Sequence, residues 1–223
     1  VIVMVPIKTM LAHRANYGTK RGGPIEWLVM HYTSNDGDSG MSNARYFQKA
    51  LNPVASAHYF VDDREIVQSV PDEYVAFHCG AYKYRHPFCR NYNSIGIEMC
   101  DAKRDGRVMA TDKTIDNAAD LAAMLCEKYN IPVDHIIRHY DVTGKLCPKY
   151  WVDDPQGIVR FRNMVKERIE MVSKCKMIID GKEIEVERIL KDGTNYIKIR
   201  DIAKALDLEV SNKGNIPILS HKQ

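Results

Sequence analysis

The sequence predicts an α/β fold with a mixed β-sheet and, at its C-terminal end, a small additional αβ module. Three observations support this. Short apolar runs typical of strands alternate with amphipathic helical patterns along the first 170 residues. Two of these runs, 57–61 and 65–70, flank a short polar turn and therefore form a hairpin, so the sheet cannot be wholly parallel. The pattern changes after Lys174, where short hairpin-like segments follow one another.

The first third of the chain supplies a loop, a strand, a helix and the hairpin. Residues 5–24 lack periodicity and contain several Gly and Pro, which predicts an extended, looped segment. Residues 25–32 are an apolar and aromatic run that predicts the first strand. A helix capped by Ser39 or Ser42 is expected to run to about Leu51, because Asn52-Pro53 cannot continue it.

The middle of the chain begins with a predicted long loop, residues 71–94, and loops of this length in compact domains are usually functional. The strand 94–100 follows, and its alternation places Ile95, Ile97 and Met99 on one face and Gly96 and Glu98 on the other. A strongly amphipathic helix is predicted over 111–129. A short strand at 136–137 and a helix over 155–172 complete the main domain.

We place the domain boundary between residues 173 and 174, which gives domains 1–173 and 174–223. Asp180-Gly181 between 175–179 and 183–186 is a strong hairpin signal. A short helix around 201–206 and two short strands within 208–219 follow. A module of this size has little core of its own, so it is expected to pack on the main domain or on a second copy of itself.

Composition allows a full core but decides little about function. The 223 residues are 45% hydrophobic, with a net charge of +3 that weakly favours an anionic partner such as cell wall or nucleic acid. No apolar run reaches 18 residues, so no membrane span is expected. The apolar opening, residues 1–6, is too short for a signal peptide core, which predicts a cytoplasmic location. Six cysteines without a CxxC motif suggest a reduced protein, although Cys79 and Cys89 could pair if it works outside the cell.

A histidine and a cysteine bracket a short loop near residue 140. His139 follows the run Ile136-Ile137, and Cys147 returns eight residues later, so an imidazole and a thiolate can share one ion. His31, at the end of another apolar run, is the third candidate ligand. Three protein ligands with a position left for water are typical of a catalytic zinc site. The alternative remains that these are buried, hydrogen-bonded histidines and an inert thiol.

Glu98 is the best candidate for a general base, because a carboxylate on an otherwise apolar strand is costly unless it is paired or functional. An exposed edge-strand glutamate is the alternative. Lys145 lies two residues before Cys147, where its charge favours the thiolate, and it could also stabilise an oxyanion. His58 and His78 could donate to a substrate carbonyl or could simply be packed side chains.

Five segments together resemble the type-2 N-acetylmuramoyl-L-alanine amidases, a family that includes phage endolysins and shares its fold with peptidoglycan recognition proteins. They lie in the family's order over about residues 20 to 170, and are Val29-Met-His-Tyr-Thr33, Ser56-Ala-His-Tyr-Phe60, Phe77-His-Cys-Gly80, Asn93-Ser-Ile-Gly-Ile-Glu98 and Arg138-His-Tyr-Asp with Lys145-Leu-Cys-Pro148. The resemblance implies a central mixed sheet flanked by helices, with a substrate cleft over a Zn²⁺ ion.

The same resemblance implies hydrolysis of the peptidoglycan amide that joins the muramic acid lactyl group to L-alanine. It implies His31, His139 and Cys147 as zinc ligands, with Glu98 and Lys145 as catalytic residues. His58, His78 and Asn93 lie in the matched motifs and are candidates for substrate binding. One departure concerns a catalytic tyrosine of some members, in whose place this chain has His58, with Tyr59 one position away.

The C-terminal module resembles small repeats appended to clostridial secreted and phage wall proteins, through Ile178-Ile-Asp-Gly-Lys-Glu and Tyr196-Ile-Lys-Ile-Arg-Asp-Ile-Ala. Wall targeting is the favoured role, and a homodimer contact or an inert spacer are the alternatives. Nucleic acid is not expected as a partner, and an endolysin of this kind would stay in the cytoplasm until lysis. Two other functions remain open: a non-catalytic peptidoglycan-recognition module, and a structural-zinc protein with four protein ligands.

Overall fold

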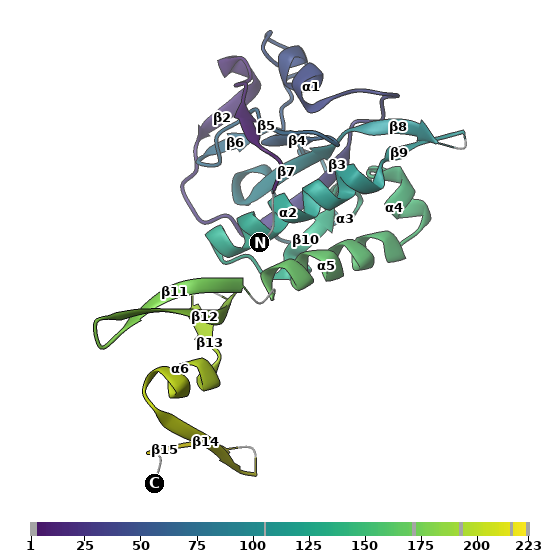
Figure 1. The fold of residues 1–223 in the computed structure, drawn as a ribbon. Helices are drawn as coiled ribbons and strands as arrows, with labels where there is room; N and C mark the ends of the chain where they lie inside the picture. Colours follow the sequence, from purple (N-terminus) through teal and green to yellow (C-terminus); the bar gives the residue numbers. More distant parts are fainter. Residues whose placement is uncertain (1–3, 105, 171–172, 192–193, 215, 222–223) are drawn as a thin grey trace. The chain divides into compact units, whose positions relative to one another are not determined.

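The computed structural model describes residues 4–104, 106–170, 173–191, 194–214 and 216–221 (Figure 1). The chain divides into two compact units, Ile2–Arg168 and Ile169–Gln223. We describe each unit by itself. The functional division into domains 1–173 and 174–223 stays a prediction.

The first unit is built on a six-stranded sheet in the order β1-β5-β4-β7-β3-β10. Its strands are β1 (Ile7–Thr9), β3 (Trp27–Tyr32), β4 (Tyr59–Val61), β5 (Ile66–Gln68), β7 (Ser94–Met99) and β10 (Ile136–Arg138). The β4–β5 pair is antiparallel, as a hairpin requires, and the other neighbours run parallel. The predicted mixed α/β sheet is therefore confirmed.

Five α-helices accompany this sheet in the described part of the unit: α1 (Gly40–Tyr46), α2 (Asp112–Tyr129), α3 (His139–Thr143), α4 (Lys149–Asp153) and α5 (Gln156–Ile169). Three short 3-10 helices lie at Arg14–Asn16, Asn91–Asn93 and Val133–His135. Two small antiparallel pairs lie outside the main sheet: β2 (Tyr17–Lys20) with β6 (Tyr74–Ala76), and β8 (Asp101–Arg104) with β9 (Arg107–Ala110). None of these helices combines the length and the apolar character that crossing a bilayer requires.

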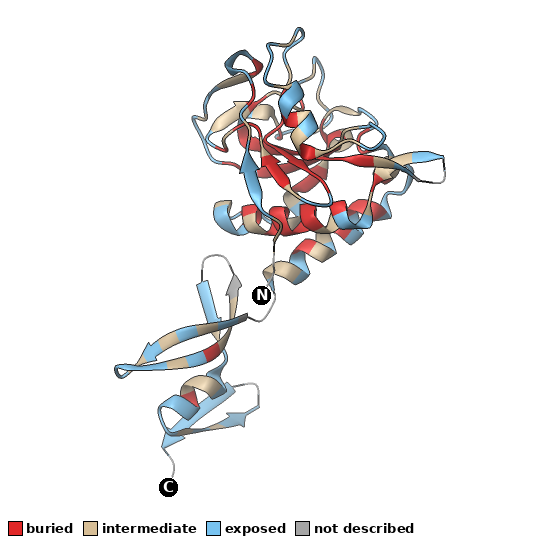
Figure 2. Ribbon diagram, turned by 45° about the horizontal axis from the view of Figure 1, so that its top comes forward, coloured by how far each residue is buried: buried red, intermediate tan, exposed pale blue. Residues whose placement is uncertain are grey.

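Strand register determines which side chains lie on each face of the sheet. Phe60, Glu98 and His31 are neighbours across β4, β7 and β3, so their side chains share one face. The next register row, which includes Ile97 and Met30, faces the other way. Figure 2 shows that burial is concentrated in the central strands and in the helix surfaces that cover them.

Helices cover both faces of the sheet. On the face that carries Phe60, α1 packs through Ala44 against Phe60 and Val67. The long helix α2 contacts β4 and β7 from the opposite side, with Leu121 and Leu125 fully buried (Figure 1). The first face therefore keeps room for polar side chains beyond α1.

Three predicted segments differ from the structure. The first is the long loop expected over 71–94, which contains β6 (Tyr74–Ala76) because this segment pairs with β2. The helix expected to reach Leu51 ends at Tyr46. Beyond it, the Asn16 side chain forms hydrogen bonds with backbone groups that a longer helix would use. Its amide N–H donates to the carbonyls of Phe47 and Lys49, and its amide oxygen accepts from the Leu51 N–H. The segment 5–24, predicted as a loop, contains β1 and β2. These strands exist because of long-range pairing with β5 and β6, which local sequence does not reveal.

Asp72 joins several elements of the first unit. It accepts hydrogen bonds from the hydroxyls of Tyr59 and Tyr129, each at 2.6 Å, and from the Lys128 ammonium at 3.0 Å. Burial by itself raises the pKa of Asp72, but the hydrogen bonds from Tyr129, Tyr59 and Lys128 outweigh it and leave the pKa below its usual value. The ionised carboxylate therefore stabilises the fold, and this stability is lost as the pH falls through the folded-state pKa.

We expect Asp72→Asn to lower the free energy of unfolding of this unit by about 2–3 kcal/mol, because hydrogen bonds to a buried charge are lost. Urea unfolding followed by tryptophan fluorescence measures this unit selectively, since Trp27 and Trp151 are the only tryptophans of the chain. The control Asp153→Asn alters an exposed carboxylate and should change stability by less than about 0.5 kcal/mol. Equal effects of the two changes would contradict this role.

In its described residues, the second unit contains two small antiparallel sheets and one helix. Strands β11 (Ser173–Ile179), β12 (Lys182–Lys191) and β13 (Thr194–Ile197) form one sheet, and β14 (Leu208–Lys213) pairs with β15 (Ile216–His221). Helix α6 (Ile199–Ala205) lies between them in sequence. Asp180 and Gly181 both have positive φ, so the predicted hairpin turn is present. Among the described residues of this unit, Val186 and Ala203 are the buried ones.

Candidate metal centre

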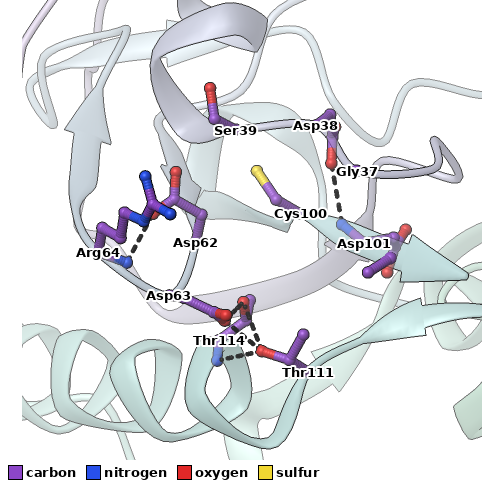
Figure 3. A pocket seen from close by; sticks show the side chains of 11 residues that line it. Gly37, Asp38, Ser39, Asp62, Asp63, Arg64, Cys100, Asp101, Thr111 and Thr114 are labelled. Carbon is purple, nitrogen blue, oxygen red and sulfur yellow. Dashed lines mark hydrogen bonds between the residues drawn. The ribbon is translucent and has the colours of Figure 1, made fainter. Parts of the chain in front are cut away.

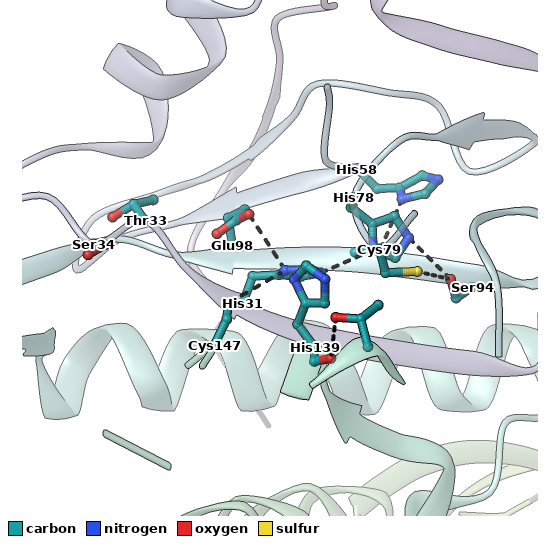
Figure 4. A network of polar contacts seen from close by, with 12 residues as sticks. His31, Thr33, Ser34, His58, His78, Cys79, Ser94, Glu98, His139 and Cys147 are labelled. Atoms are coloured by element: carbon teal, nitrogen blue, oxygen red, sulfur yellow. Dashed lines mark hydrogen bonds and ion pairs between the residues drawn. The ribbon is translucent and has the colours of Figure 1, made fainter. Parts of the chain in front are cut away.

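His31, His139 and Cys147 converge on the sheet face that carries Phe60 (Figure 4). One nitrogen or sulfur atom from each lies within 4.8 Å of the others, and all three side chains are buried. His31 Nδ1 is 3.8 Å from Cys147 Sγ, and the His31 and His139 rings meet at 4.6 Å between centroids. Within the described ranges, no other group of three His, Cys, Asp or Glu residues comes this close together.

Strand pairing explains why His31 and His139, which are 108 positions apart in the sequence, lie close together. Strands β3 and β10 are parallel neighbours with Met30 opposite Arg138, so the next residues, His31 and His139, leave the same edge of the sheet. His139 begins α3 rather than ending a strand. Two backbone hydrogen bonds then bring Cys147 back: Tyr140 N–H donates to the Cys147 carbonyl at 3.0 Å, and Cys147 N–H donates to the Lys145 carbonyl at 2.7 Å.

The donor set fits a zinc ion. His139 Nδ1 is buried and has no hydrogen-bond partner in the described part of the chain, so no protein group competes with an ion for this nitrogen. Burial lowers the pKa of His139 to about 3 and that of His31 well below its usual value, which keeps both rings neutral as metal ligands must be. Imidazole nitrogens and thiolates are both zinc ligands, and three protein ligands leave the fourth position open in catalytic zinc sites.

The structure corrects the expectation that the charge of Lys145 makes Cys147 a thiolate. Burial raises the pKa of the Cys147 thiol to about 12, and the charge of Lys145 lowers it by less. The expected effect of Lys145 has the right direction, but it does not outweigh desolvation. A bound cation is therefore the group that would make Cys147 a thiolate.

Glu98 stands beside the cluster. It is the register partner of His31 across β3 and β7, and its Oε1 is 3.8 Å from His31 Nδ1. Its Oε2 is buried without a hydrogen-bond partner among the described residues. Burial raises the pKa of Glu98 to about 8, whereas Lys145 lowers it. Lys145 itself is exposed, and its charge also lowers the pKa of His139.

The other three candidates lie at different distances from the cluster. His78 contacts it directly, with Nδ1 at 3.0 Å from His31 Nε2. His58 is fully buried; it accepts from the Gly96 N–H and its ring lies 5.7 Å from that of His78. The amide of Asn93 donates a hydrogen bond to Glu26 at 2.7 Å. Substrate binding by these three residues stays a prediction.

Two residues to which the sequence assigned no role at the site shape the cluster. Ser94 Oγ is 3.1 Å from His78 Nε2. Gly96 leaves space for the same ring, since a Cβ there would lie 2.5 Å from His78 Cγ. Both precede Glu98 at alternate positions of β7, so the period of two along this strand was the available signal.

Cys79 and Cys89 lie in the loop above this site as free, fully buried thiols. They pack with Trp27, Val29 and Ile137 in one apolar cluster. Whether these two cysteines pair when the protein works outside the cell stays untested.

A separate cavity of about 300 Å³ is lined by several acidic residues (Figure 3). Its carboxylates are used within the fold. Asp62 accepts from the Gly40 N–H at the start of α1, at 2.8 Å, and Asp63 accepts from the Thr114 hydroxyl near the start of α2, at 2.7 Å. The acidic residues of this cavity therefore hold loops against the starts of α1 and α2, and they are not part of the candidate metal centre.

The fold and the cluster define an α/β protein with a buried group of three potential metal ligands beside a carboxylate. The chain belongs to the N-acetylmuramoyl-L-alanine amidase family, whose sequence profile matches residues 21–150. It is 34% identical over 200 residues to the N-acetylmuramoyl-L-alanine amidase CwlL of Bacillus licheniformis, which covers 85% of this chain and 54% of the relative. It is 37% identical over 165 residues to BlyA of Bacillus subtilis strain 168, with 68% and 44% covered. The chain thus spans about half the length of these curated relatives.

Solved structures agree with this membership. The catalytic domain of PlyG superimposes with a TM-score of 0.60 at 29% identity, over 73% of this chain and 94% of that domain. A mutant endolysin from Bacillus subtilis superimposes with a TM-score of 0.58 at 28% identity, over 73% and 99%. The predicted central sheet flanked by helices is the fold of these proteins.

Proposed function

We propose that this protein is a zinc-dependent N-acetylmuramoyl-L-alanine amidase that cuts the amide bond between the muramic acid lactyl group and L-alanine of peptidoglycan. The observation that carries the proposal is the convergence of His31, His139 and Cys147 beside Glu98, in a chain of this family. His31, His139 and Cys147 would hold the ion. Zinc bound there would supply a Lewis acid that polarises the scissile carbonyl and activates water at an open position.

Glu98 is the residue we assign to proton transfer. Its carboxylate lies beside the ligand cluster and keeps one oxygen without a partner among the described residues, so it can accept a proton from the attacking water. As the new C–O bond forms and the C–N bond breaks, Glu98 passes that proton to the leaving alanine nitrogen. The products are a lactyl carboxylate and a peptide with a free alanine amino group.

Lys145 is assigned to the oxyanion of the tetrahedral intermediate, because its exposed ammonium lies close enough to affect Glu98, His139 and Cys147 electrostatically. We expect Lys145→Ala to lower kcat by about 100-fold to 1,000-fold, the usual cost of losing one such donor. The control Lys149→Ala removes an exposed lysine that pairs with Asp153 and should leave kcat unchanged. Equal rates for Lys145→Ala and the unaltered protein would exclude Lys145 from the oxyanion site.

End-group analysis tests the function itself. Purified peptidoglycan is incubated with the protein, with a zinc chelator, and with chelator followed by added zinc. New alanine amino groups that disappear with the chelator and return with zinc are the expected result. New reducing sugars would mean a glycosidase, and wall binding without new ends would mean a recognition module.

For the second unit we propose a role in wall binding, with self-association as the alternative. Its small buried core and its exposed apolar side chains support either role, and the latter include Ile178 at 71%, Tyr196 at 54% and Ile216 at 67% exposure. We also propose that the protein acts on the wall after it is released at lysis. Pull-down of this unit with insoluble peptidoglycan, beside sedimentation of the full chain, separates the two roles.

A further inference from the structure

His31 is linked through the side chains of His78 and Ser94, which Figure 4 shows, to a backbone carbonyl acceptor. His31 Nε2 lies 3.0 Å from His78 Nδ1, and His78 Nε2 lies 3.1 Å from Ser94 Oγ. The Ser94 hydroxyl in turn donates to the Arg90 carbonyl at 2.6 Å. These contacts form one uninterrupted chain from the metal cluster to the backbone of the loop above it.

The carbonyl at the end of the chain fixes the direction of each hydrogen bond. A carbonyl only accepts, and the Ser94 hydroxyl has a single proton, so Ser94 Oγ must accept from His78 Nε2–H. A neutral imidazole carries one N–H, which leaves His78 Nδ1 as an acceptor for His31 Nε2–H. His31 Nδ1 is then the unprotonated nitrogen, and this atom faces Cys147 Sγ at 3.8 Å.

Strand β7 is built to hold this chain in place. Ser94, Gly96 and Glu98 alternate along it and therefore share the face that carries His31. Ser94 is fully buried, and the missing side chain of Gly96 lets the His78 ring lie against the strand. One face of β7 thus supplies three things. Ser94 is the last side chain of the hydrogen-bond series, Gly96 leaves space for the His78 ring, and Glu98 is the carboxylate beside the metal cluster.

We propose that Ser94 and His78 are positioning residues that hold His31 in its Nε2–H tautomer, so that Nδ1 is ready as a metal ligand before any ion binds. The inference rests on His31 being a zinc ligand, as the proposed function requires. Partners of this kind typically change metal affinity by about 10-fold to 100-fold when they are removed. Ser94→Ala should weaken zinc binding by that factor, since His78 loses its acceptor and both rings can exchange tautomers.

The test uses the full chain with Ser94→Ala and a matched control, Ser69→Ala. Ser69 is equally buried, but its hydroxyl has no hydrogen-bond partner within the described ranges. Zinc affinity is measured by competition with a chromogenic chelator, and the His31 tautomer by ¹⁵N NMR of the metal-free protein. Ser94→Ala is expected to lower affinity and give mixed tautomers, whereas Ser69→Ala changes neither. Ser94→Thr, which keeps the hydroxyl, should restore both.

Two results would overturn the inference: a His31 that carries its proton on Nδ1 in the unaltered metal-free protein, or a Ser94→Ala protein with unchanged tautomer and affinity. Neither measurement uses substrate. The unaltered protein could fail to cut peptidoglycan while Ser94→Ala still shifts the His31 tautomer. That result would support the positioning role of Ser94 and His78 but contradict the proposed function, so failure of the inference and failure of the proposed function can be distinguished.

Discussion

Replacing Glu98 with glutamine is expected to lower kcat by about 100-fold to 10,000-fold while zinc remains bound at one ion per chain. This range is the usual contribution of a positioned general base. Glutamine has nearly the same shape as glutamate but cannot accept the proton of the attacking water. The effect should therefore appear in kcat measured on muramyl peptides, with little change in stability. Glu73→Gln, at an exposed position, is the control and should keep full activity.

A Glu98→Gln protein that retains most of its activity with zinc bound would exclude Glu98 as the base. Metal content must be measured on the same sample, because Glu98 lies 3.8 Å from His31 and a lost ion would mimic a lost base.

Replacing Cys147 with alanine is expected to abolish activity by removing one of three metal donors. Zinc affinity should fall by more than about 100-fold, since even loss of a group that only orients a ligand can cost that much. Cys147→Asp should keep part of both properties, because a carboxylate is also a zinc ligand. The measurements are chelator competition and the rate of muramyl peptide hydrolysis.

The matched control for Cys147 is Cys126→Ala, which removes another buried thiol, at a position on α2. It should leave zinc affinity unchanged, because Cys126 is not part of the donor cluster. Should both cysteine variants bind zinc like the unaltered protein, the ion would have to bind elsewhere.

Local patterns were sufficient where a short segment determines its own structure. Asp180-Gly181 predicts a two-residue hairpin turn, and both residues have the positive φ that such a turn needs. The alternation of Ser94–Met99 places Glu98 on the polar face of its strand, and the structure puts it beside His31. The grouping of His31, His139 and Cys147 follows from ligand chemistry and strand ends, and these residues do converge.

Features that depend on distant partners could not be predicted from local patterns. Helix α1 stops early because Asn16, far away in sequence, binds the backbone that follows it. The hairpin β8–β9 is an exception, because it is a local feature that was not predicted although Asp105-Gly106 is a turn signal in the sequence. The link from His31 through His78 to Ser94 exists only once two strands and a loop are assembled, so spacing alone cannot show it.

The most direct test of the zinc centre is X-ray absorption at the zinc edge on the full, zinc-loaded chain. This account predicts one sulfur, two histidine nitrogens and one further light atom around the ion, with the sulfur lost in Cys147→Asp. A site with no sulfur in the unaltered protein would remove Cys147 from the ligand set. A spectrum showing four protein ligands would mean a structural zinc and would contradict the catalytic role assigned to the cluster.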